Sequence, residues 1–118
     1  MRIGSEHAFQ FAVVRNLKAT GFLLWNTDVM DALKFFKTKD PMRFAFISHH
    51  KKMGYTKGQS DLVVVKNGRF WAVELKTEDG RQSKEQKQFQ AECEKQGISY
   101  VIIRNFVDLE EFIKGAEK

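Results

Sequence analysis

An Asn-Gly pair between two apolar runs constrains the fold of this chain more than any other feature. The run Asp61–Lys66 leads into Asn67-Gly68, and the run Arg69–Lys76 leads away from it. Asn-Gly flanked by β-branched and aromatic residues is the strongest short-range signal for a hairpin with a two-residue turn. The sequence therefore predicts two antiparallel strands in which Lys66 lies opposite Arg69.

This register brings two acidic side chains together. Counting outward from the turn places Asp61 directly opposite Glu74, with Cβ atoms roughly 5 Å apart. Lys76 lies two residues beyond Glu74 and so projects from the same face. A divalent cation would relieve the repulsion, and Mg²⁺ is usually held by one or two carboxylates plus substrate phosphate. The alternative is a surface acidic pair beside a lysine that forms a salt bridge, and a bulge or longer turn would shift the pairing.

The positive charge of the chain is concentrated in one segment. The chain has 20 basic and 15 acidic residues, a net charge of +5. The segment 34–57 holds seven of the basic residues, interleaved with aromatic ones, and Asp40 is its only acid. This pattern favours a polyanionic ligand, nucleic acid first, although a solvated basic loop is the alternative. The candidate nucleic-acid-binding residues are Lys51, Lys52, Tyr55 and Lys57.

Length and composition exclude several classes of protein. The 118 residues suit one compact domain spanning 1–118. No apolar run approaches the ~20 residues of a membrane span, and the N-terminus has no apolar signal-peptide core. Cys93, the single cysteine, excludes an internal disulfide, fits a reducing compartment and is expected to be a core thiol. We expect a soluble cytoplasmic protein with no membrane partner.

The remaining pattern predicts helices around a mixed sheet. Because the hairpin is apolar on both faces, it needs helices on both sides. The expected elements are a helix from Ser5 to about Gly21, a strand at 43–48, a polar loop at 49–58, a helix capped by Ser83 and stopped by Gly97, a strand at 98–103, and a terminal helix capped by Asp108. Segment 22–40 is ambiguous, with a possible strand at 22–25 and a short helix at 29–36. The predicted fold class is a small α/β structure with a central antiparallel hairpin.

The spacing of the acidic residues resembles a known superfamily. Gly58-Gln59-Ser60-Asp61, twelve residues and then Glu74-Leu75-Lys76 resemble the PD-(D/E)xK nucleases, with Ser60 in place of the usual proline. The following segment, 77–86, with Phe89 and Gly97, is similar to the virus-type replication-repair nuclease (VRR-NUC) branch. The resemblance runs from Gly58 to about Arg104 and implies a restriction-endonuclease-like core.

The resemblance implies roles for individual residues. Asp61 and Glu74 would bind the metal ion, with the backbone carbonyl of Leu75 as a further ligand. Lys76 would be the catalytic lysine.

Two further residues have local alternatives to their implied roles. Gln86 would support the site, but it could equally complete a capping box with Ser83. Glu6 matches an acidic position near the metal centre, but it could simply favour a helix N-terminus. Gly58 is expected to adopt a positive φ or to allow close backbone approach.

The resemblance also implies an activity. Members cleave DNA phosphodiesters with Mg²⁺ or Mn²⁺, and short phage-type members are often homodimers that cut branched DNA such as Holliday junctions. The expectation is therefore an endodeoxyribonuclease with no small-molecule cofactor. Substrate geometry, the number of metal ions, a non-catalytic DNA-binding module and a subunit of a larger repair complex remain open. A zinc site at His49 and His50 lacks a second ligand cluster, so phosphate contact is preferred there.

Overall fold

The computed structural model describes residues 5–27, 33 and 35–117, apart from the side chains of Ser5 and Glu6. The expected short helix at 29–36 therefore lies largely outside the described residues. Within them, no helix combines the length and the apolar character needed to cross a membrane. The elements, in chain order, are α1 (Ser5–Ala19), β1 (Leu23–Asn26), α2 (Pro41–Lys52), β2 (Leu62–Lys66), β3 (Arg69–Leu75), α3 (Lys84–Lys95), β4 (Ser99–Ile103) and α4 (Phe106–Ala116).

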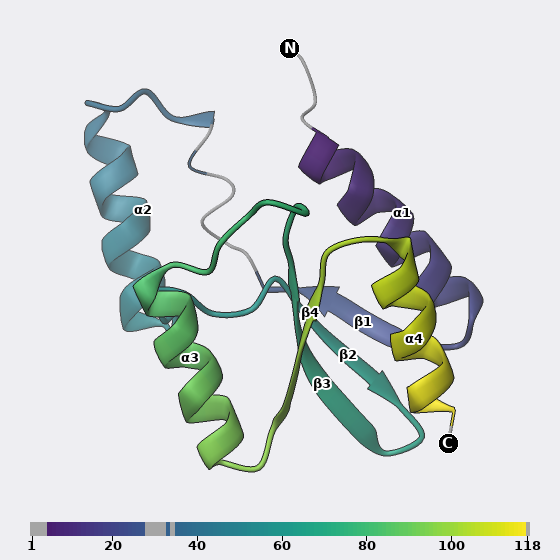
Figure 1. Cartoon of the computed structure of the whole chain (residues 1–118). Coiled ribbons are helices and arrows are strands. Elements are labelled where there is room, and N and C mark those ends of the chain that lie inside the picture. Colours follow the sequence, from purple (N-terminus) through teal and green to yellow (C-terminus); the bar gives the residue numbers. More distant parts are fainter. Residues whose placement is uncertain (1–4, 28–32, 34, 118) are drawn as a thin grey trace.

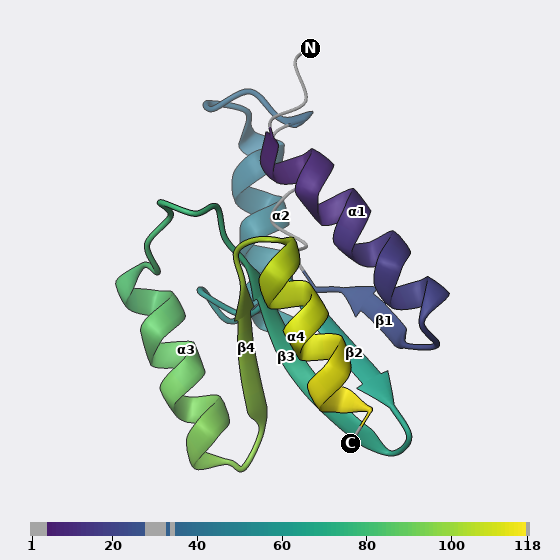
Figure 2. The ribbon, with the colours of Figure 1, turned by 45° about the vertical axis from the view of Figure 1, so that its right-hand side comes forward.

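The sheet is mixed, as predicted. Its strand order is β1-β2-β3-β4, and only the β3–β4 pair is parallel. A parallel pair needs a crossover connection, which α3 provides between β3 and β4. Figures 1 and 2 show α1 and α4 on one side of the sheet and α3 on the other. The predicted α/β class, with helices on both faces, is confirmed.

The hairpin has the predicted turn and register. Asn67 and Gly68 both have positive φ, 52° and 77°, as a two-residue type I′ turn requires. The strand pairs run without a bulge from Lys66–Arg69 to Leu62–Val73. If the same register continues, the next residues opposite each other are Asp61 and Glu74.

The core lies between the sheet and the two helices α1 and α4. It joins Val13 and Leu17 of α1, Leu62, Val64, Trp71 and Val73 of the hairpin, Ile103 of β4, and Leu109, Phe112 and Ala116 of α4. The opposite face is covered only in part. There Val63 and Val65 are half-buried and Phe70 is 51% exposed, because α3 packs mainly against β4, with Phe89 against Tyr100.

Residues 43–48 form the middle of helix α2, so the prediction of a strand there is wrong. Pro41 suggests a break in the sequence, but proline is favoured in the first turn of a helix. Asp40 caps that turn, its carboxylate accepting a hydrogen bond from the N–H of Met42 at 2.9 Å. The predicted loop 49–58 is also shorter than expected, since His49 to Lys52 complete α2. The strand beside β2 is instead β1, from the ambiguous segment.

The cap of the terminal helix also differs from the prediction. Asn105 caps α4, its side chain accepting a hydrogen bond from the N–H of Asp108 at 2.8 Å. Asp108 lies in the first turn, where its carboxylate accepts from the N–H of Arg104 at 2.9 Å. Asn and Asp are nearly equivalent as caps, so the sequence alone did not separate them.

Candidate active site

Asp61 lies where the hairpin strands end, beside Glu74. Its Oδ2 accepts a hydrogen bond from the backbone N–H of Leu75 at 2.7 Å, across 14 residues of sequence. On the other side of Asp61, its carbonyl accepts from the N–H of Thr27 at 2.9 Å. Asp61 is therefore fixed between β1 and β3, and its carboxylate points to the end of β3.

Glu74 is a buried acid with an incomplete set of partners. Its side chain is 1% exposed. Oε1 accepts hydrogen bonds from the hydroxyl of Tyr100 at 2.6 Å and from the amide of Gln82 at 3.3 Å. Oε2 is buried and has no partner among the described residues. A buried carboxylate oxygen without a partner is costly, so such an atom calls for an explanation.

Tyr100 is the closest neighbour of Glu74. Burial raises the pKa of the Tyr100 hydroxyl well above its usual value, and the hydrogen bond and negative charge of Glu74 and the charge of Asp61 raise it further. The hydroxyl therefore stays protonated and donates to Glu74 at neutral pH. That both acids act on this one hydroxyl shows that Asp61 and Glu74 share its surroundings.

The loop after β3 is anchored so that Gln82 reaches Glu74. The guanidinium of Arg104 donates to the carbonyls of Thr77, at 2.9 Å, and Gly80. The Gln82 amide also donates to the side-chain oxygen of Gln90 on α3, at 2.9 Å. These bonds join β4, the loop and α3 around the buried carboxylate.

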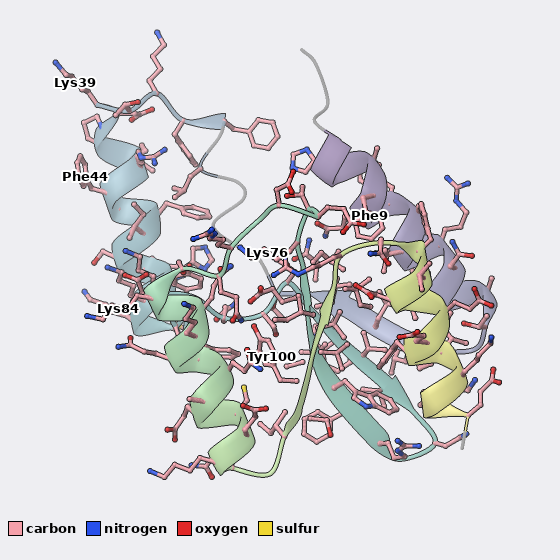
Figure 3. The ribbon with its side chains drawn as sticks, viewed as in Figure 1. Phe9, Lys39, Phe44, Lys76, Lys84 and Tyr100 are labelled. Carbon is pink, nitrogen blue, oxygen red and sulfur yellow. The ribbon has the colours of Figure 1, made fainter. Side chains whose placement is uncertain are left out.

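Lys76 and Leu75 occupy the end of β3 beside the acids. The N–H of Lys76 donates to the carbonyl of Ile103 at 3.1 Å, which fixes the peptide that carries the Leu75 carbonyl. The side chain of Lys76 is half-buried. Figure 3 shows Lys76 above Tyr100, at the end of the sheet from which the 77–82 loop leaves.

Gln86 forms the capping box. Its Oε1 accepts from the N–H of Ser83 at 2.8 Å, and the Ser83 hydroxyl accepts from the N–H of Gln86 at 3.1 Å. The glutamine that reaches Glu74 is Gln82, four residues earlier. Glu6 lies in the first turn of α1, and its side chain is outside the described residues.

Gly58 brings the segment before Asp61 against the start of α3. Its φ is +88°, and a Cβ there would lie 2.4 Å from the backbone carbonyl of Glu85. Both expectations for this glycine, positive φ and close backbone approach, are confirmed. The contact fixes the chain three residues before Asp61, since any larger residue would push α3 away.

The expected DNA-contact residues lie on two neighbouring elements. Lys51 and Lys52 are exposed in the last turn of α2, and Tyr55 is half-buried just after it. Lys57 pairs with Glu85 of α3 at 3.4 Å. A hydrogen bond to its own backbone and then the charge of Lys57 lower the pKa of Glu85. Lys57 is thus partly neutralised, whereas Lys51 and Lys52 present their charge to solvent.

The donor set fits a hard divalent ion bound by few protein ligands. Within the described part of the chain, no three His, Cys, Asp or Glu side chains are grouped to hold a metal ion. Two carboxylates, one of which has a buried unpartnered oxygen, match an ion that keeps several waters, as Mg²⁺ does. His49 and His50 lie together on α2, with ring centroids 5.2 Å apart, and belong to no such group among the described residues.

Tyr100 and Gln82 were not foreseen from the sequence. Tyr100 offered a weak signal, because it is the one tyrosine in the apolar run 98–103. In the sheet it pairs with Ala72, which lies two residues before Glu74. Gln82 gave none, because its contact depends on the path of the loop. Both bonds join residues whose proximity only the folded sheet creates.

Comparisons with known proteins bear on the fold. No protein-family model matches the chain, and no curated protein does. A solved structure described as a VRR_NUC domain is similar, with a TM-score of 0.67 and 18% sequence identity. The alignment covers 95% of this chain and 97% of that one. The chain therefore has the fold of a VRR-NUC domain, a mixed α/β fold of the PD-(D/E)xK type.

Proposed function

We propose that this chain is a metal-dependent DNA endonuclease that acts as a single nuclease domain. The observation that carries the proposal is the buried Glu74, whose Oε2 has no partner among the described residues, at the end of the hairpin that also carries Asp61. A purely structural acid would be expected to have both oxygens satisfied. Asp61 and Glu74 would hold Mg²⁺ or Mn²⁺, together with the backbone carbonyl of Leu75.

Each protein group would have a separate task in phosphodiester hydrolysis. The chemistry that a divalent ion supplies when bound is neutralisation of phosphoryl charge and a more acidic water. Tyr100 and Gln82 orient Glu74, and the N–H of Leu75 orients Asp61. Lys76 would position the attacking water or stabilise the charge that develops at the phosphoryl oxygens. The water oxygen bonds to phosphorus as one ester P–O bond breaks, giving a phosphate monoester and an alcohol.

Gln86 and Glu6 would have supporting roles. The capping box made by Gln86 fixes the first turn of α3, next to the loop that carries Gln82. Glu6 would act from the first turn of α1, as the resemblance implies. Neither residue is needed for the two-carboxylate arrangement itself.

We further propose that the substrate is branched DNA, such as a Holliday junction, and that the active form is a homodimer. The resemblance to short VRR-NUC proteins supports both ideas, and resolving a junction requires two paired cuts. The exposed charges of Lys51 and Lys52 would contact the phosphate backbone. An intracellular setting follows from this choice of substrate.

A cleavage panel tests the proposal. The chain would be incubated with four-way junction, flap, nicked and plain duplex DNA, each with Mg²⁺, Mn²⁺ or a chelator. We expect metal-dependent cleavage that is strongest on branched substrates and is lost in the Asp61→Ala and Lys76→Ala variants. Variants that cut as well as the parent would disprove the assigned mechanism.

A further inference from the structure

Strand β1 forms an open edge of the sheet beside helix α1. Among the described strands, β1 pairs with β2 alone. Thr27 continues this register opposite Asp61, and its N–H donates to the Asp61 carbonyl at 2.9 Å. Hydrogen-bonded positions alternate along an antiparallel pair, so Leu24 directs its backbone N–H and C=O away from β2. The outer edge of β1 therefore presents backbone groups with which a further strand can pair.

An apolar groove lies along this edge, beside α1. It has a volume of about 520 Å³. Leu24 and Leu62 line it from the core face of the sheet, and Val14 lines it from α1. Phe11 of α1 also lines the groove and is 59% exposed. A strand residue paired with Leu24 would point its side chain to the same face as Leu24, into this groove.

The opposite face of β1 is also exposed. Leu23 and Trp25 alternate with Leu24 and so point to the other side of the sheet, where they pair with Val65 and Val63. Leu23 is 64% exposed and Trp25 is 48% exposed. A further strand beside β1 would place its remaining side chains next to these two residues. A single extended segment would therefore cover exposed apolar groups on both faces of β1.

The charge around the groove favours an acidic segment. Arg15 and Lys18 line the groove, and a separation of three residues places them on one side of α1. No acidic residue is among the described residues that line it. Antiparallel pairing with the β1 of a second copy would set the two α1 helices side by side and bring these cations together. Such like-charge contact is unfavourable, whereas carboxylates of a different protein would complement the cations.

We propose that the outer edge of β1 and the groove beside it bind an extended acidic peptide of a partner protein, which joins the sheet as a fifth strand. Recognition would combine backbone hydrogen bonds to Leu24, apolar contact with Phe11, and carboxylates beside Arg15 and Lys18. The groove opens on the core face of the sheet, whereas Asp61 points to the opposite face. Peptide binding and DNA cleavage can therefore be tested separately.

A labelled heptapeptide of the sequence Thr-Glu-Ile-Val-Ile-Glu-Thr tests strand pairing by fluorescence polarisation. Its valine and glutamates share one face, and in the groove the valine N–H would point to β1. N-methylation of the valine should raise the dissociation constant at least roughly 10-fold, because it removes a hydrogen bond and blocks close approach. N-methylation of the first isoleucine, whose N–H would point away, should change it less than about twofold. An equal effect at both positions, or a larger one at the isoleucine, would overturn the proposal.

Charge changes in the peptide and in the protein locate the binding. Lysine in place of both peptide glutamates should raise the dissociation constant roughly 10-fold. Arg15→Gln with Lys18→Gln should raise it roughly 5-fold for the acidic peptide. Lys87→Gln with Lys95→Gln removes two exposed charges from α3 and should change it less than about twofold. Equal weakening by the two pairs of substitutions would show that net charge, and not the groove, attracts the peptide.

The remaining outcomes identify other occupants and separate this proposal from the nuclease function. A chain that fails to bind the peptide would overturn the proposal, and a dimer seen by light scattering would then assign the edge to a second copy. Displacement of the peptide by oligothymidylate would also overturn it, because the groove would then bind nucleic acid. Asp61→Asn should bind the peptide as the parent does. A parent that binds the peptide but cuts no DNA would support this proposal and count only against the nuclease function.

Discussion

The end of the hairpin that carries Asp61 and Glu74 is close to helix α2 along the chain, but the two regions differ in how deeply their side chains are buried. Glu74 is 1% exposed and lies next to core residues of β3. Helix α2 has no buried residue, and Met42 and Phe44 are 62% and 67% exposed on it. In Figures 1 and 2, α2 extends away from the sheet.

The difference separates two kinds of contribution to function. The carboxylates are positioned by the same strand register that builds the core, so chemistry and folding share one scaffold. Lys51 and Lys52 are exposed at the end of α2, so their charges can bind a partner without supporting the fold. Substitutions near the carboxylates should therefore change cleavage or stability, whereas substitutions on α2 should change mainly DNA binding.

The largest effect should come from Asp61→Asn. The asparagine oxygen can still accept the hydrogen bond from Leu75, while the charge that would hold a metal ion is removed. We expect the cleavage rate to fall by about 10²-fold or more with a nearly unchanged melting temperature. Rates on junction DNA and thermal unfolding measure the two effects.

Asp79→Asn is the matched control for that variant. Asp79 is exposed in the loop after β3 and undergoes the same chemical change. It should cut as well as the parent. Equal losses in both variants would show that net charge near the site, and not metal ligation, controls the rate.

Tyr100→Phe should change both stability and activity. It removes the hydroxyl that donates to Glu74 at 2.6 Å and leaves a buried carboxylate with one fewer donor. We expect a loss of about 1–3 kcal/mol in the free energy of unfolding, measured by urea denaturation, and slower cleavage. A Tyr100→Phe variant as stable and active as the parent would mean that Glu74 does not depend on this hydrogen bond.

Lys51→Gln with Lys52→Gln should weaken DNA binding with little effect on stability. Both residues are exposed at the end of α2. If each lysine neutralises one phosphate, the salt dependence of log K should become shallower by about 0.9 for each substituted lysine. Cleavage at saturating DNA should stay close to that of the parent, and an unchanged salt slope would exclude α2 from the DNA interface.

The smallest effect should come from the α3 cap. Ser83→Ala and Gln86→Ala each break the capping box and should cost about 1 kcal/mol in thermal or urea unfolding. If Gln86 acts only through the cap, both variants should cut saturating DNA equally well. A much slower Gln86→Ala variant would assign this glutamine a direct role at the site.

The same contrast explains what the sequence predicted. The hairpin register depends on one local turn, so Asn67-Gly68 was enough to place Asp61 beside Glu74. One face of α2 is half-buried, and it combines Phe46 and Ile47 with the polar Arg43 and His50, so the helix shows no clear apolar period. The alternation of Phe44 and Phe46 with small or charged residues therefore suggested a strand. The partners of Glu74 were missed because they come from the 77–82 loop and β4, brought together only by tertiary structure.

Metal binding by Glu74 tests the central claim most directly. The affinity of the chain for Mn²⁺ can be measured by electron paramagnetic resonance without DNA, and compared with that of Glu74→Gln. Glu78→Gln, in the exposed part of the loop, serves as the control. We predict that the parent and Glu78→Gln bind Mn²⁺ alike and that Glu74→Gln, folded by circular dichroism, binds at least about 10-fold more weakly. Equal Mn²⁺ binding by all three proteins would contradict the assignment of the buried carboxylate as a metal ligand.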